Sequence, residues 1–165
     1  MVAFIGLRKL LGIGGGTASS PRDRRSPSRP KPRGAHGYPG DFTGTVRTEY
    51  SPSADGDPDP GEIVWTWVPY EEDHSQGKDR PVLLVGRDGD WLLGLQLTSK
   101  DHDRDAADEA RYGRRWIDIG SGPWDAKGRP SEVRLDRVIR VEPAAVRREG
   151  AILERKLFTK VTDSL

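Results

Sequence analysis

The sequence contains no cysteine, a single methionine and three widely separated histidines. Without cysteine the chain forms no disulfide bridge and no thiolate metal site, and the scattered histidines lack the spacing of metal ligands. We therefore expect no metal ion and no other cofactor. A reducing cytoplasm is the compartment that fits this composition most simply.

Apolar residues are also scarce, and no long run of them occurs. Hydrophobic residues make up 33% of the chain, against roughly 45–50% in typical globular proteins, while 20 glycines and 13 prolines are many for 165 residues. The apolar start, residues 2–11, is too short to cross a bilayer. It also lacks the leading basic region and cleavage site of a secretory signal. We expect part of the chain to be unfolded and no part to enter a membrane.

Charge is unevenly distributed along the chain. Residues 1–34 hold eight basic side chains and one acidic one, a net charge of +7. Because the whole chain has a net charge of +1, the remaining residues have a net charge of −6. From residue 14 to about residue 38 the chain is mainly Gly, Ser, Pro and Arg, a composition that does not bury enough apolar surface to fold. Residues 1–40 are therefore predicted to be a disordered basic extension. Its charge either attracts the phosphates of RNA or a membrane, or is simply solvated.

The pattern of short apolar segments predicts the architecture of the rest. Residues 42–50 are rich in β-branched and aromatic residues, so residues 41–60 are predicted to be a strap or linker before a domain at residues 61–165. An Asp-Gly pair at Asp88 and Gly89 predicts a hairpin turn. Further strands are predicted at residues 63–68, 82–85, 91–97 and 116–119, a strand pair or bent strand at 133–141, a short exposed helix within 101–111, and an amphipathic helix over 152–161. This order favours an all-β barrel with a minor C-terminal helix over a parallel α/β sheet.

Four blocks within this predicted domain share a resemblance. They are Pro-Gly-Glu-Ile-Val-Trp at residues 60–65, Arg-Pro-Val-Leu-Leu-Val at 80–85, Leu-Thr-Ser at 97–99, and Val-Arg-Leu-Asp at 133–136 followed by Ile-Arg at 139–140. In this order and spacing they resemble the MazF/PemK (Kid) family of toxins. The resemblance implies an SH3-like barrel of the CcdB/MazF/PemK type. It also implies a homodimer that cuts single-stranded RNA without a metal and is neutralised by a cognate antitoxin.

Three residues match the phosphate-handling blocks of that family. Arg80 matches the arginine at the entrance to the second strand. Its guanidinium would stabilise the charge on the reacting phosphate through paired N–H groups, or donate a proton indirectly. Thr98 and Ser99 match the pair that ends the third strand and would hold a phosphate oxygen. The alternatives are a solvated arginine before a proline and a hydroxyl pair that caps a turn.

Four residues match the Kid branch more closely. His74 and Gln76 correspond to the histidine and glutamine of the first loop, with Gln76 expected to bind substrate. Arg134 and Asp136 match an Arg-x-Asp pair whose members point to one face of a strand. The resemblance implies that Asp136 is the general base and an arginine the acid, assisted by His74 and Thr98. The alternatives are a salt bridge for Asp136 and a solvent-exposed loop position for His74.

Two features depart from the family or add to it. The acidic stretch at residues 101–109 falls where the family has a substrate-flanking loop, and it would repel an RNA backbone unless it folds away. Trp124 lies in a Gly/Pro loop and is predicted either to pack in the core or to stack on a base or an antitoxin side chain.

One other function remains open, and a further one is not supported by the sequence. The barrel is either a nuclease or a non-catalytic module that binds nucleic acid or protein. A related gyrase-poisoning toxin uses a C-terminal aromatic segment, which residues 162–165 do not provide.

Overall fold

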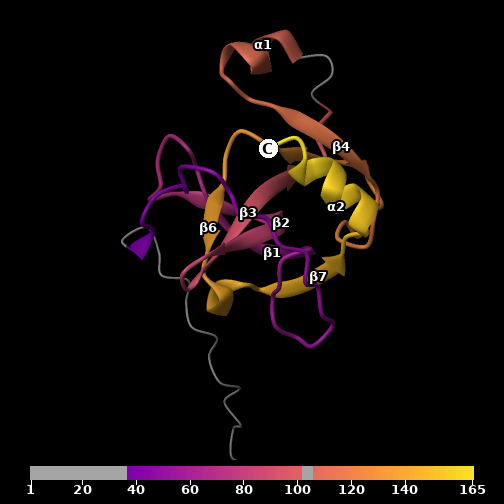
Figure 1. Ribbon diagram of the computed structural model, residues 1–165. Coiled ribbons are helices and arrows are strands. Elements are labelled where there is room, and N and C mark those ends of the chain that lie inside the picture. The colour runs from indigo at the N-terminus through magenta and orange to yellow at the C-terminus, as the bar shows by residue number, and fades with distance from the viewer. Residues whose placement is uncertain (1–36, 102–105) are drawn as a thin grey trace, which may run out of the picture.

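The computed structural model describes residues 37–101 and 106–165, without the side chains of residues 148–150. The predicted disordered extension falls almost entirely on residues outside this range. Seven antiparallel strands in the described residues form one curled sheet, which α2 covers (Figure 1). The strands are β1 (Glu62–Pro69), β2 (Gly77–Asp88), β3 (Trp91–Thr98), β4 (Trp116–Gly120), β5 (Ser131–Arg134), β6 (Ile139–Val141) and β7 (Arg148–Ile152). The helices are α1 (Ala106–Arg111), η3 (Pro143–Ala145) and α2 (Arg155–Thr162).

The strand order explains the curl of the sheet. The order is β4-β5-β3-β2-β1-β7, and β6 also pairs with β3. One edge of β3 thus pairs with two short strands, with β6 at Leu92–Gly94 and with β5 at Leu97–Thr98. The register of β2 against β3 shifts between Leu84 and Gly86, an irregularity that bends a strand. The sheet therefore closes toward a barrel, which confirms the predicted fold class.

The central strands are buried on both faces, because β2 and β3 carry nearly continuous apolar runs. One cluster packs under α2 and the strap, and a second lies on the opposite face of the sheet. The first includes Ile63, Leu83, Val85, Leu93, Leu95, Leu97, Phe158 and Val161. The second is Val64, Val68, Val82, Leu84, Leu92, Ile139 and Val141. Gly89, at the predicted hairpin turn between β2 and β3, has a φ of 59°, which glycine adopts without strain.

The C-terminal helix begins later than predicted, and β7 was not predicted at all. Ile152, expected in the helix, pairs with Glu62 as the end of β7 and is half exposed. The backbone N–H of Leu153 donates to Gly61 at 2.9 Å, so the chain is held to β1 until the helix starts at Arg155. No helix within the described residues has the length and apolar character to cross a bilayer.

The segment at residues 37–60, called the strap below, lies along the sheet. Phe42, Val46 and Tyr50 pack against the first core cluster. Backbone hydrogen bonds join Phe42 to Val138 and Glu49 to Val85, each at 2.9 Å. The strap is therefore part of the packed structure rather than a free connection.

Candidate active site

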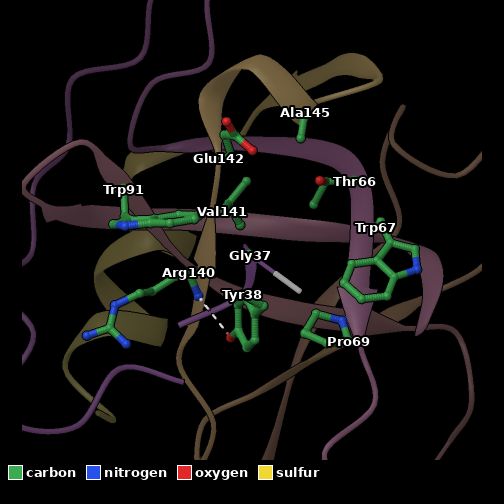
Figure 2. Close-up of a pocket in the computed structure, with 10 residues that line it drawn as sticks. All are labelled: Gly37, Tyr38, Thr66, Trp67, Pro69, Trp91, Arg140, Val141, Glu142 and Ala145. Carbon is green, nitrogen blue, oxygen red and sulfur yellow. Dashed lines mark hydrogen bonds between the residues drawn. The ribbon is translucent and has the colours of Figure 1, made fainter. Parts of the chain in front are cut away.

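A cleft of about 240 Å³ opens at one end of β2 and β3. It is lined by Trp65, Lys78, Asp79, Arg80, Pro81, Leu97, Thr98, Ser99, Asp125, Arg129 and Ser131. Arg80, Thr98 and Ser99, the three residues predicted to handle a phosphate, all belong to this set. A second hollow, shown in Figure 2, has a volume of only about 30 Å³, room for a water molecule but not for a nucleotide.

The strand register places Arg80 and Thr98 side by side. Val82 of β2 pairs with Gln96 of β3. Two positions further along each strand come Arg80 and Thr98. Alternate residues of a strand point to the same side, so both belong to the face on which Val82 is packed. Ser99 follows at the exposed end of β3.

The two carboxylates of the cleft are neutralised by neighbouring arginines. Arg147 is ion-paired with Asp79. Arg129 donates to Asp125 at 2.8 Å, and this hydrogen bond, together with one from the Lys127 backbone, holds the pKa of Asp125 below its usual value. Each carboxylate therefore has a cationic partner, which weakens its repulsion of a phosphate.

Lys78 and Arg80 are the cations of the cleft that have no carboxylate partner among residues 37–101 and 106–165. They are two residues apart on β2, so both side chains lie on one side of the strand. Lys78 is exposed and Arg80 half-buried. The cleft therefore combines two uncompensated positive charges with the hydroxyls of Thr98 and Ser99, an arrangement suited to an anion.

Arg134 and Asp136 form a separate cluster with Glu71. Arg134 donates to Asp136 at 2.7 Å and to Glu71 at 2.9 Å, and its side chain is 7% exposed. Burial alone would raise the pKa of Asp136. Hydrogen bonds from Arg134 and from the backbone N–H of Arg115, at 2.8 Å, instead hold that pKa below its usual value. Asp136 is therefore an ionised carboxylate with its oxygens already engaged.

His74 lies on the loop between β1 and β2. Asp73 shapes this loop, because its side chain accepts hydrogen bonds from both the backbone and the hydroxyl of Ser75. The backbone N–H of Tyr70 donates to Gln76 at 2.9 Å, which closes the loop and leaves Gln76 exposed. The His74 ring meets the edge or face of Tyr38 at a centroid distance of 5.1 Å. Neither His74 nor Gln76 lines the cleft.

The prediction that Trp124 stacks on a base or an antitoxin side chain is wrong. Its ring is 4% exposed, and its indole N–H donates to Ser131 at 2.9 Å. Its backbone carbonyl accepts from the indole of Trp65 at 2.9 Å. A Cβ on Gly122 would collide with this ring, so the Gly/Pro loop folds the tryptophan inward. Trp124 supports the wall of the cleft from within the core.

Apart from Trp124 in the core, the predicted site residues thus fall in three places: the cleft, the Arg134 cluster and the first loop. The cleft and the cluster are close through β5. Thr98 pairs with Glu132, and Arg134 is two residues further along that strand, a step of about 7 Å on the same face.

Sequence reasoning missed Lys78, Glu71 and the Arg129–Asp125 pair. Lys78 precedes Arg80 by two residues and follows from strand alternation once β2 is known to start at Gly77. The predicted strand began only at Val82. No local pattern could reveal Glu71, because its contact joins residues 63 apart in the sequence.

The strand order, the hairpin of β2 and β3 and the polar cleft at their end define a small antiparallel barrel with an anion-suited site. The model of the PemK-like, MazF-like toxins of type II toxin-antitoxin systems matches residues 59–165. The chain belongs to this family of toxins. No curated protein matches the chain. Within the described residues, no group of three or more His, Cys, Asp or Glu side chains is arranged to hold a metal ion.

Proposed function

We propose that this toxin is an endoribonuclease that cuts single-stranded RNA without a metal ion. The 2′-hydroxyl attacks the neighbouring phosphorus, and the bond from phosphorus to the 5′-oxygen breaks. The 2′-hydroxyl gives up its proton to a base, and the 5′-oxygen takes a proton from an arginine that acts as the acid, leaving a cyclic phosphate and a free 5′-hydroxyl. The observation that carries this proposal is the cleft in which Lys78 and Arg80, without carboxylate partners in the described residues, lie beside Thr98 and Ser99.

The proposed roles divide between the cleft and the Arg134 cluster. Arg80 stabilises the charge that builds on the phosphoryl oxygens, and Thr98 and Ser99 hold one of those oxygens. Asp136 is the base for the 2′-hydroxyl, and Arg134 keeps it ionised. The low pKa of Asp136 makes it a weak base, so it requires close positioning of the hydroxyl.

His74 assists the reaction and Gln76 contacts the substrate in this proposal. Both belong to the loop that carries Glu71, whose carboxylate binds Arg134. The loop is therefore attached to the Arg134 cluster through an ion pair. Movement of RNA into the cleft would bring it alongside this loop.

The experiment is digestion of single-stranded RNA in EDTA, with the cut ends mapped. We expect wild-type protein to leave cyclic phosphate ends. Arg80→Ala is expected to lower the rate about 100-fold or more, because it removes charge stabilisation of the transition state. Arg80→Lys restores the charge but not the planar pair of donors, so its rate falls between the two.

Arg87→Ala is the matched control, because Arg87 lies on the same strand but binds Asp59 at 2.9 Å, outside the cleft. It should cut RNA at the wild-type rate. Intact RNA with both wild type and Arg80→Ala contradicts the nuclease proposal.

A non-catalytic binding barrel is the second candidate. It is favoured by the hydrogen bonds that already occupy both oxygens of Asp136. RNA binding that survives Arg80→Ala, with no cleavage by either protein, would support it.

The proposal also covers partners and location. The family is one of type II toxin-antitoxin systems, so we expect a cognate antitoxin that binds this barrel. We further propose a homodimer that acts on mRNA in the cytoplasm. Co-expression with the gene product of a neighbouring small reading frame, followed by a growth assay, tests the antitoxin.

A further inference from the structure

The first residues of the strap are fixed to the barrel by two arginines. Arg137 binds both carboxylate oxygens of Asp41, at 2.8 and 3.2 Å, and its side chain is only 5% exposed. Arg140 donates to the backbone carbonyls of Gly40 and Asp41 at 2.8 and 3.1 Å. Its guanidinium also lies over the ring of Phe42. Bidentate pairs of this kind fix geometry as well as adding stability.

Tyr38 is held in place by these contacts. Its hydroxyl donates to Asp41 at 2.6 Å and accepts from the backbone N–H of Arg140 at 3.3 Å. Figure 2 shows the second bond as a dashed line. Burial, and then the hydrogen bond to Asp41, raise the pKa of Tyr38 well above its usual range. The hydroxyl therefore stays protonated and remains a donor to Asp41.

The fixed ring of Tyr38 contacts His74 on the first loop. The two rings are perpendicular, at 89°, with their centroids 5.1 Å apart, a favoured geometry for aromatic pairs. Burial alone would raise the pKa of Asp41, but hydrogen bonds from Arg137 and Tyr38, with smaller contributions from the charges of Arg137 and His74, hold it below its usual value. The loop residues on either side of His74 are exposed, whereas His74 itself is half-buried.

We propose that Tyr38 is a positioning residue that orients the imidazole of His74 toward the RNA-cleaving site, so that the strap upstream of the family match takes part in the reaction. This inference rests on the proposed function. Tyr38 itself does not line the cleft, so it acts only through His74. A histidine on a loop needs such support, because small errors in the position of an assisting group cost large factors in rate.

The orientation of His74 is tested by nuclear magnetic resonance, without any need for activity. The ring current of Tyr38 shifts the resonances of the nearby imidazole protons, and these resonances are assigned by their loss in His74→Gln. We expect Tyr38→Leu to move the His74 resonances toward those of a histidine in an unstructured peptide. Tyr38→Phe keeps the ring but loses both hydroxyl contacts, so it should give a smaller change in the same direction.

The consequence for the reaction is tested on the same samples by RNA cleavage. We expect Tyr38→Leu to lower kcat about ten-fold with KM nearly unchanged, because substrate binding in the cleft is untouched. Tyr50→Phe is the control. It removes the other tyrosine hydroxyl contact of the strap, to the carbonyl of Leu153 at 2.7 Å. It should leave both the His74 resonances and kcat at wild-type values.

Two results would overturn the inference. One is a set of His74 resonances that does not move in Tyr38→Leu, and the other is a set that moves while kcat stays constant. Wild-type protein that leaves RNA intact refutes the proposed function instead, and the resonance measurement distinguishes that failure from a failure of the contact.

Discussion

The contacts of Arg134 determine how the stability of the cluster that it forms with Glu71 and Asp136 depends on pH. Arg134 is nearly buried and binds Glu71 and Asp136 together. A buried guanidinium that loses a partner is left with an uncompensated charge, which is costly. The stability of this part of the barrel is therefore linked to the ionisation of Asp136.

Asp136→Asn should lower the free energy of unfolding at pH 7 by about 1 to 2 kcal/mol, since a hydrogen bond to a charged group is lost from a side chain that is still 17% exposed. The pKa of Asp136 is lower in the folded chain than its unfolded value of 3.8. Its contribution is thus fully present above that value and disappears as the pH falls through the folded-state pKa. Urea unfolding between pH 7 and pH 3 measures the difference between the two proteins.

The exposed Asp90 supplies the control for this measurement. Asp90→Asn should track wild type at every pH. If the difference in unfolding free energy between wild type and Asp136→Asn stays constant down to pH 3, the ionisation of Asp136 does not contribute to stability.

At the scale of the element, the sequence predicts those strands and helices that are determined by a local pattern of residues. The apolar runs of β1 to β3 and the Asp-Gly turn lie within short windows, so the apolar centres of these strands and their hairpin follow from the sequence alone. The polar start of β2 at Gly77 does not. Residues 147–150 have no apolar alternation, and β7 forms because β1 offers a free edge to residues far away in the chain. The helix at the C-terminus was predicted too early for the same reason.

The candidate site shows the same division. Arg80 and Thr98 come together because side chains alternate along a strand and because Val82 of β2 pairs with Gln96 of β3. The burial of Trp124 depends on the space beside Gly122 and on the hydroxyl of Ser131. These packing details cannot be predicted from the spacing of residues along the sequence.

The helix α2 closes one side of the core, and Phe158 is one of its two buried residues. It is 4% exposed and its ring lies 4.9 Å from that of Tyr50 in the strap. Phe158→Ala should lower the free energy of unfolding by about 3–5 kcal/mol, through lost burial and the cavity left behind. Urea denaturation measures this loss. Lys156→Ala, at an exposed position of the same helix, should change stability by no more than about 0.5 kcal/mol, and equal losses in the two variants would contradict the packing role of α2.

At the scale of the whole molecule, the net negative charge of the barrel limits RNA binding to a small part of its surface. Residues 35–165 carry −6, so most of the barrel repels a phosphate backbone. The cleft is an exception, because its carboxylates are paired with arginines, whereas Lys78 and Arg80 have no carboxylate partner in the described part of the chain. We therefore expect binding to depend on a few contacts rather than on a broad basic surface.

Lys78→Ala tests this expectation. The logarithm of the association constant for single-stranded RNA should fall less steeply with the logarithm of salt concentration, by about 0.7 in slope for one lost phosphate contact. Titrations use RNA with 2′-O-methyl groups, which block the attacking hydroxyl. Lys156→Ala, on α2 and outside the cleft, should leave the slope unchanged, and an unchanged slope in Lys78→Ala would remove Lys78 from the contact surface.

The strap also sets where the barrel can be shortened. A polypeptide starting at residue 59, where the family match starts, would lose the Phe42, Val46 and Tyr50 side chains from the first core cluster. It would also lose Asp41, the carboxylate that buried Arg137 binds. A recombinant protein that begins at Gly37 or earlier retains these contacts. We expect a protein that begins at residue 59 to aggregate, because part of its apolar core is exposed.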